Sequence, residues 1–114
     1  MAREAKFEIK LRKNDHFMFN LIAPNNEVIL TSEGYTTKEN CKKGIESVRK
    51  NSLVATKFLK LIDYPTTKVY FVLKAGNGEI IGRSQLYENE ATRKIGIASV
   101  KKFAATAALV DKSK

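Results

Sequence analysis

The sequence predicts an α+β domain in which two tandem β-β-β-α units share one antiparallel-rich sheet, with both helices on one face. Three observations predict it: the chain repeats itself at a spacing of fifty-two residues, apolar residues alternate in the first part of each copy, and they recur every three or four residues in the second part. A unit of about fifty residues buries too little apolar surface to be stable alone. We therefore expect one domain over residues 1–114, built from repeats at about 5–54 and 55–111 around a pseudo-two-fold axis.

The repeat is clearest in two phrases, APNNEVILTSEGY at 23–35 and AGNGEIIGRSQLY at 75–87. Identical residues recur before, within and after them: Phe19/Phe71, Leu21/Leu73, Ala23/Ala75, Asn25/Asn77, Glu27/Glu79, Ile29/Ile81, Ser32/Ser84, Tyr35/Tyr87, Lys42/Lys94, Gly44/Gly96, Ile45/Ile97, Ser47/Ser99, Val48/Val100 and Lys50/Lys102. The early matches fall on every second residue, which is the period of a strand, and the later apolar matches have helical spacing.

Each copy begins with one further strand. In the first copy Phe7, Ile9 and Leu11 alternate with charged residues, and Leu59 and Leu61 are expected to hold the matching places in the second copy.

A hairpin follows in each copy. Asn25-Asn26 and Asn77-Gly78 suit its tight turn, since Gly and Asn tolerate positive φ. A two-residue loop then puts these side chains on the core face: Phe17, Phe19, Leu21, Ala23, Val28 and Leu30, answered by Val69, Phe71, Leu73, Ala75 and Ile80.

The last element of each copy is a helix. Thr36 or Thr37 is expected to cap the first helix, and Asn89 the second. One apolar stripe consists of Cys41, Ile45 and Val48, matched by Ile97, Val100 and Ala104. A glycine inside a helix costs about 1 kcal/mol relative to alanine, yet each helix has one, Gly44 and Gly96. We expect the helix backbone to approach the sheet or the other helix closely at these positions.

Positive charge concentrates on the two predicted helices, and the formal net charge of the chain is +9. The residues predicted to bind nucleic acid or another polyanion are Lys42, Arg49, Lys50, Lys94, Lys101 and Lys102. Two such stripes would follow two runs of phosphates, with affinity that depends on salt more than on nucleotide sequence. The alternative is a solvated helix surface with no binding role.

A second surface is predicted on the sheet face that the helices leave open. Strand alternation places there Met18, Ile22 and Ile29 from the first copy and Tyr70, Val72 and Ile81 from the second. A partly apolar face of this kind suits a protein partner or a homo-oligomer contact. The alternative is a twisted sheet with scattered apolar residues. We expect a monomer with internal pseudo-symmetry or a weak homodimer.

The residues do not assemble into a catalytic or metal site. His16 and Cys41 are the only His and Cys in the chain, so zinc is not expected, nor is any cofactor. GNGEIIG has the wrong spacing for a dinucleotide fingerprint and joins strand to strand. Cys41 is either a nucleophile, with His16 as base, or a small core residue, and the second reading is favoured. The hydroxyls of Ser32 and Tyr35, and of Ser84 and Tyr87, either orient a ligand or pack against the helices, and packing is favoured.

The N-terminal residues MAREAKFEIK are charged where a signal peptide needs an apolar region. The chain also lacks an apolar run long enough to span a bilayer. These features and the single cysteine indicate a cytosolic protein without membrane contact.

The pattern NGEIIGRSQLY followed by KIGIASVKK, with its weaker copy NNEVILTSEGY followed by KKGIESVRK, resembles the YegP-like family of mostly bacterial proteins. The resemblance covers about Lys6 to Val110. It implies a sheet with exchanged last strands, a strand near Lys57 to Ile62 that belongs to both halves, and a short final strand at Ala108 to Asp111. Pro24 and Asn26 depart from the family's phrase, where glycine or a small residue is common. The resemblance implies no activity or catalytic residue.

Overall fold

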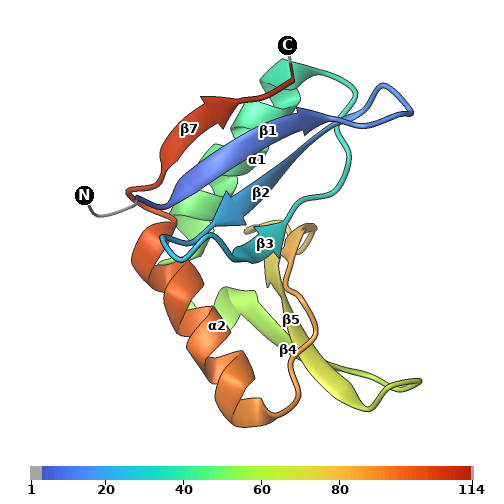
Figure 1. The fold of residues 1–114 in the computed structure, drawn as a ribbon, viewed down its shortest axis with the longest axis vertical. Coiled ribbons are helices and arrows are strands. Elements are labelled where there is room, and N and C mark those ends of the chain that lie inside the picture. The colour runs from blue at the N-terminus through green and yellow to red at the C-terminus, as the bar shows by residue number, and fades with distance from the viewer. Residues whose placement is uncertain (1–3, 114) are drawn as a thin grey trace.

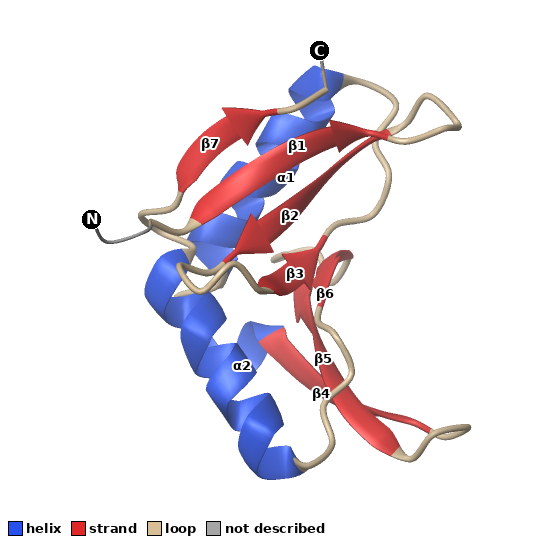
Figure 2. Ribbon diagram, viewed as in Figure 1, coloured by secondary structure: helices blue, strands red, loops and turns tan. Residues whose placement is uncertain are grey.

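The computed structural model describes residues 4–113, which form one seven-stranded sheet with two helices packed on one face (Figures 1 and 2). The elements are β1 (Lys6–Leu11), β2 (Phe17–Ile22), β3 (Val28–Thr31), α1 (Lys38–Asn51), a 3₁₀ turn (Ala55–Lys57), β4 (Phe58–Asp63), β5 (Lys68–Lys74), β6 (Ile80–Arg83), α2 (Glu90–Phe103) and β7 (Ala108–Asp111). Side chains of both helices and of the sheet form one core cluster. The predicted α+β fold is confirmed.

The pseudo-two-fold axis passes between β3 and β6. The strand order is β4-β5-β6-β3-β2-β1-β7, so each copy contributes one half of the sheet and the halves meet at the centre. Thr31 pairs with Arg83 across this junction, in antiparallel orientation. These two residues are fifty-two positions apart, so the junction pairs a residue with its own counterpart in the repeat.

Both hairpins contain a β-bulge, where a two-residue loop was predicted. The Ala23 N–H donates to Glu27 O at 2.9 Å, and the matching Ala75 N–H donates to Glu79 O at 2.8 Å. Each turn therefore has three loop residues, the last of which has positive φ: Asn26 (72°) and Gly78 (85°). Ladder pairing then shifts by one residue in the following strand.

In each half of the sheet, the bulge moves one side chain out of the core and another into it. Leu30 pairs with Leu21, and Val28 pairs with Ile22. A two-residue loop would have paired Val28 with Ala23. The prediction that Val28 and Ile80 belong to the core was therefore wrong: they are 39% and 38% exposed. Ile29 and Ile81 take their places in the core cluster.

The first strand of the second copy is also displaced by one residue from the prediction. Phe7 pairs with Leu21, and Phe58 pairs with the matching Leu73. Phe58 is therefore the core residue, and its ring meets Phe71 edge to face with centroids 5.7 Å apart, as Phe7 meets Phe19 in the first copy. The prediction that Leu59 and Leu61 match Phe7 and Ile9 was wrong, because β1 and β4 are related by fifty-one residues.

The helix caps agree with the sequence. The Thr37 side chain accepts a hydrogen bond from the Asn40 N–H at the start of α1. The Asn89 side chain accepts from the Thr92 N–H, and the Thr92 hydroxyl completes a capping box on α2. These caps satisfy backbone donors that the first helical turn leaves unpaired.

Each helix glycine has a tyrosine ring against it. A Cβ on Gly44 would lie 2.7 Å from Cζ of Tyr35 and 3.2 Å from the Phe19 ring, and Tyr87 crowds Gly96 in the same way. The helix backbone does make a close approach at each glycine, as expected, and the group that it approaches is a tyrosine side chain from the sheet side of the core.

The short final strand, β7, pairs in parallel with β1 at the edge of the sheet. Lys38, the first residue of α1, donates to the Asp111 carboxylate at 2.8 Å. This ion pair fixes the end of β7 to the start of α1.

Candidate functional site

The predicted basic residues, apart from Arg49, lie exposed along the two helices. Lys42 and Lys50 project from α1, and Lys94, Lys101 and Lys102 project from α2. None of these five lysines makes an ion pair with a residue in the described range 4–113. Their charges are therefore available to solutes.

Arg49 has a structural role that its position in the sequence did not predict. Its Nη1 donates to the carbonyl oxygens of Ala104 and Ala105, at 3.1 and 3.2 Å, beyond the last turn of α2. Its guanidinium lies 4.9 Å from the centroid of the Phe7 ring, and its Nε binds Glu46 at 3.1 Å. Arg49 thus joins α1 to the end of α2, and it cannot serve a ligand freely.

The Arg49 contacts bring the C-terminal ends of the two helices together, as Figure 1 shows. Lys50 lies in the last turn of α1, and Lys101 and Lys102 lie in the last turn of α2. The last turns that carry Lys50, Lys101 and Lys102 therefore lie near the point where the two helices meet. Cations at helix C-termini also interact favourably with the helix dipole, which gives them a purely structural benefit.

The six residues predicted for the open sheet face have a different environment from the one expected. Ile29 and Ile81 belong to the core because of the bulges, as described above. Met18, Ile22 and Val72 do lie on the side opposite the core cluster, but neighbouring side chains bury them to 7%, 8% and 0% exposure. Tyr70 is half-buried, with the Arg83 guanidinium 5.5 Å from its ring centroid. The open face therefore offers less apolar surface than the prediction assumed.

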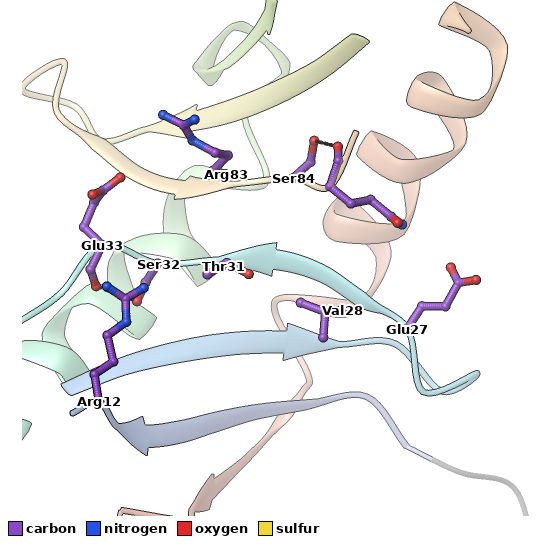
Figure 3. Close-up of a pocket in the computed structure, with 9 residues that line it drawn as sticks. Arg12, Glu27, Val28, Thr31, Ser32, Glu33, Arg83 and Ser84 are labelled. Carbon is purple, nitrogen blue, oxygen red and sulfur yellow. Dashed lines mark hydrogen bonds between the residues drawn. The ribbon is translucent and has the colours of Figure 1, made fainter. Parts of the chain in front are cut away.

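A hollow of about 620 Å³ lies where β3 and β6 meet (Figure 3). The residues that line it are Arg12, Glu27, Val28, Thr31, Ser32, Glu33, Arg83, Ser84 and Gln85. The sequence pattern did not predict the hollow. The repeat in the sequence was nevertheless a signal for it. Thr31 pairs with its repeat counterpart Arg83, and the two twisted halves of the sheet diverge on either side of this pair.

The hollow has mixed charge and few uncommitted polar groups. Two arginines and two glutamates line it, so neither sign of ligand is favoured. The Ser32 hydroxyl accepts from the Phe19 N–H and donates to Glu33 O, and Ser84 does the same with Phe71 and Gln85. The Thr31 hydroxyl donates to the Asn20 side chain at 2.8 Å. The hydroxyls therefore complete the sheet instead of facing a ligand.

Tyr35 and Tyr87 are likewise structural. Each exchanges two backbone hydrogen bonds with β2 or β5, through Phe17 and Val69. Their rings stack on Phe19 and Phe71 with centroids 6.3 Å apart, beneath the helix glycines. Burial raises the pKa of both tyrosine hydroxyls, which keeps them protonated.

Cys41 is fully buried in the core cluster. Burial, followed by the negative charge of Asp111, raises the pKa of its thiol to about 11. A nucleophilic cysteine needs the opposite shift. His16 packs beside Gly34 in the loop region before β2 and donates its backbone N–H to Asn14. The structure thus favours the interpretation of Cys41 as a core residue.

Within residues 4–113, no three His, Cys, Asp or Glu side chains cluster as metal ligands would. No helix in the described part of the chain is long and apolar enough to cross a membrane.

Comparison with known proteins identifies the family. A family model described as a domain of unknown function, DUF1508, matches residues 13–58 and again residues 66–111. The chain belongs to this family. A UPF0339 protein of Pseudomonas aeruginosa is 47% identical over 96% of this chain and 98% of its own length. The UPF0339 protein YegP of Escherichia coli K12 is 47% identical over 83% of this chain and 86% of its own.

Two solution NMR structures of similar proteins share the fold. The UPF0339 protein of Shewanella oneidensis superposes with a TM-score of 0.90 at 43% identity, over 96% of this chain and 92% of that one. The yegP protein of E. coli superposes with a TM-score of 0.91 at 41% identity, over 99% and 97%. The predicted YegP-like family and its tandem-repeat architecture are confirmed, and the names of these relatives specify no activity.

Proposed function

We propose that this protein is a cytosolic, non-enzymatic module that binds nucleic acid or another polyanion through the lysines of α1 and α2. One observation carries the proposal. Lys42 and Lys94, and likewise Lys50 and Lys102, are identical at matched positions of the two repeats, yet the structure gives these side chains no ion pair within the described residues. Packing explains why the repeats share Phe19 and Phe71, but it does not explain shared exposed lysines.

The arrangement suits a long anion better than a small one. The lysines follow two helices of 14 residues each, and they do not converge on one enclosed point. Lysine is a flexible point charge, which suits phosphate contacts that are independent of nucleotide sequence. The two helices also lack exposed aromatic residues between the lysines, so base stacking is not expected to contribute.

The test is an anisotropy titration of labelled single- and double-stranded DNA and RNA at several salt concentrations. We expect the logarithm of the binding constant to fall linearly with the logarithm of salt concentration, with a slope of about −0.7 to −0.9 per phosphate contacted. Reversing Lys42, Lys50, Lys94 and Lys101 to glutamate should abolish binding. Arg49 is left intact, because its substitution would disturb the contact between the helices.

A matched control reverses four cations away from the helices: Arg12, Lys13, Lys74 and Lys112. Both variants have the same formal net charge, so only the position of the charge differs. Equal loss of binding in both would show attraction by net charge alone. Absence of binding by the unaltered protein at low salt would contradict the proposal outright.

A second candidate function is protein interaction or homo-oligomer formation through the open sheet face. Val28 and Ile80 favour it, because the bulges place these matched apolar residues outward, at 39% and 38% exposure. Replacing both with aspartate should then abolish any concentration-dependent association in sedimentation velocity. A protein that remains monomeric at all concentrations and binds no partner would argue against this candidate.

A further inference from the structure

The outer edge of β4 presents backbone groups that point away from the sheet. The Phe71 N–H donates to Ser84 Oγ at 3.0 Å, and Phe71 O accepts from the Ser84 N–H at 2.9 Å, so Phe71 faces β6. In an antiparallel ladder the residue directly opposite then faces outward, and that residue is Lys60. By the same argument Ile62 faces outward, since its partner Val69 exchanges both hydrogen bonds with Tyr87. No strand among the described residues lies beyond β4.

The other edge of the sheet shows what this geometry can accept. Ile9 lies opposite Phe19, as Lys60 lies opposite Phe71, so Ile9 and Lys60 are counterparts. The Ile9 carbonyl accepts from the Lys112 N–H at 2.8 Å, and the Ala5 carbonyl accepts from the Ala108 N–H at 3.1 Å. These bonds attach β7 in parallel to β1. The pseudo-symmetry gives the direction of an added strand along β4, and the strand can pair only from Lys60 onward. The counterpart of Ala5 is Thr56, which lies in the 3₁₀ turn, and the Phe58 N–H already donates to Ala55 O.

The side chains along the β4 edge indicate which charge an added strand should carry. At the β1 edge Asp111 lies in register with Ile9, and its carboxylate reaches the start of α1. At the β4 edge the counterpart of Ile9 is the exposed Lys60, and the counterpart of Cys41 on the helix is Arg93. An acidic side chain in register with Lys60 would therefore approach two cations, and also Glu90, which is the counterpart of Lys38 and the first residue of α2.

Arg93 is buried and only partly satisfied. It is 8% exposed, and its Nη1 donates to Leu61 O at 3.1 Å, which connects α2 to β4. Its Nε is buried without a hydrogen-bond partner. Glu90, its nearest carboxylate, lies 3.9 Å from Nη2 and is 77% exposed. A buried guanidinium with an unpaired N–H is costly, and a carboxylate at the β4 edge would reduce that cost.

We propose that the Lys60–Ile62 part of β4 binds an extended, acidic peptide segment of a partner protein as an added parallel strand, in the direction that β7 takes beside β1. Backbone hydrogen bonds to Lys60 and Ile62 hold the segment, and its carboxylate pairs with Lys60 and faces Arg93. Leu59 and Ile62, 41% and 49% exposed, contact its apolar side chains. The site is distinct from the lysines of the helices.

A second copy of this chain is a poorer occupant. Antiparallel pairing of two β4 strands about a two-fold axis brings the two Lys60 side chains toward each other, and like charges across strands are destabilising. Lysine on an edge strand is also a common protection against self-association. Lys60 thus disfavours pairing with the β4 edge of a second copy and favours pairing with an acidic segment.

The test uses the peptide TAALVDSS, acetylated and amidated, which is segment 106–113 with serine at the position of Lys112. It is titrated into isotope-labelled protein, and amide shifts and hydrogen exchange are followed by NMR. We expect shifts and slower exchange at Lys60 and Ile62. The peptide with asparagine in place of its aspartate should bind about tenfold more weakly, as loss of a charge-assisted hydrogen bond predicts.

Charge reversal gives the sharper comparison. Lys60→Glu should abolish binding of the aspartate peptide and create binding of a peptide with lysine at that position. Lys74→Glu, an equal charge change on β5, should leave the aspartate peptide bound. An unchanged spectrum outside β4 verifies that each variant is folded.

Four results would overturn the proposal. They are the absence of β4 shifts at millimolar peptide, equal affinity for the aspartate and asparagine peptides, shifts confined to β1 and β7, and concentration-dependent broadening of β4 signals without peptide. The third would mean that the peptide displaces the chain's own strand, and the fourth that β4 pairs between copies.

Discussion

Leu30 and Gly82 are counterparts in the two repeats, and they meet next to the pseudo-two-fold axis. A Cβ on Gly82 would lie 2.6 Å from both Cγ and Cδ2 of Leu30 and 3.0 Å from its Cδ1. Leu30 is completely buried, so its side chain has little room to move. Two leucines at these positions would occupy the same space, and we infer that the second repeat has glycine for this reason.

The sign of the effect of Gly82→Ala should depend on residue 30. Gly82 does not have the positive φ that disfavours alanine. Alanine is therefore expected to gain about 0.4–1 kcal/mol by restricting the unfolded chain. Against Leu30, overpacking costs about 1–3 kcal/mol. Gly82→Ala should thus destabilise the unaltered protein by about 0.5–2 kcal/mol.

Leu30→Ala alone should lower the free energy of unfolding by about 2–5 kcal/mol, because it removes a buried side chain and leaves a cavity. In that background the obstruction is gone, so Gly82→Ala should stabilise the protein by about 0.4–1 kcal/mol. The coupling between the two substitutions is then about 1–3 kcal/mol, within the range known for residues in contact.

Urea unfolding of the four proteins of this cycle, followed by circular dichroism, measures the coupling. Exchange of the two residues, Leu30→Gly with Gly82→Leu, is a second test: it moves the leucine to the mirror position, so it should cost less than the two single changes together. Additive effects within about 0.5 kcal/mol would refute the reasoning, as would a neutral Gly82→Ala in the unaltered protein.

Three further predictions follow from the fold. Gly44→Ala and Gly96→Ala should each destabilise by about 1–2 kcal/mol despite better helix propensity, because the new methyl meets a packed tyrosine ring; urea unfolding measures this, and a stabilised variant would show that the ring yields. Burial raises the pKa of Cys41, so the folded state keeps this proton to higher pH than the unfolded state, and the free energy of unfolding should fall as pH rises from 9.0 toward about 11. Cys41→Ala should reduce that slope, and Tyr35 and Tyr87, whose pKa values are also raised, account for the remainder. Rapid reaction of the thiol with a disulfide reagent at pH 7 would contradict the assignment. The hydrogen-bonded ion pair with Lys38, followed by the hydrogen bonds of Ser113, lowers the pKa of Asp111 well below its usual range. The contribution of Asp111 to stability is therefore present above the ordinary carboxyl pKa and is lost as pH falls through the pKa of the folded state. Asp111→Asn should accelerate amide exchange in β7 at pH 7 and leave exchange in β5 unchanged.

The sequence was sufficient to predict the fold because the same pattern occurs twice. Alternation identified the strands, and spacing and capping residues identified the helices, with Thr37 and Asn89 at their observed N-caps. The shared core and pseudo-symmetry followed from the small size of each unit. The final strand at Ala108 to Asp111 was implied only by resemblance to the family, since four residues carry little pattern of their own.

The errors in side-chain placement have a common physical cause. A β-strand reverses its faces whenever one residue is inserted, and the sequence does not state whether a hairpin loop has two residues or three. One left-handed residue, Asn26 or Gly78, therefore moved Ile29 and Ile81 from the predicted open face into the core. The displacement of β4 by one residue had the same effect on Leu59 and Leu61.

The candidate basic site was less predictable than the fold, because charge on a helix does not reveal what the side chain contacts. Arg49 has the same helical setting as the lysines around it, but its position beside Phe7 and the end of α2 depends on tertiary structure. The five lysines remain candidates because none of them makes an ion pair within residues 4–113.

The differences between the repeats are as informative as their identities. Leu30 and Gly82 differ because both approach the axis, where two large side chains cannot coexist. Ile9 and Lys60 differ because β7 covers Ile9, whereas Lys60 lies on the uncovered edge of the sheet. Cys41 is the helix residue on the covered side, and its counterpart Arg93 is the helix residue on the uncovered side. These substitutions follow from position in the assembled sheet. Position in the sheet does not explain why Lys42 and Lys94 are identical, and both lie outside the last helical turn, where the helix dipole would favour a cation. These two lysines are therefore the strongest ground for the proposed binding surface on the helices.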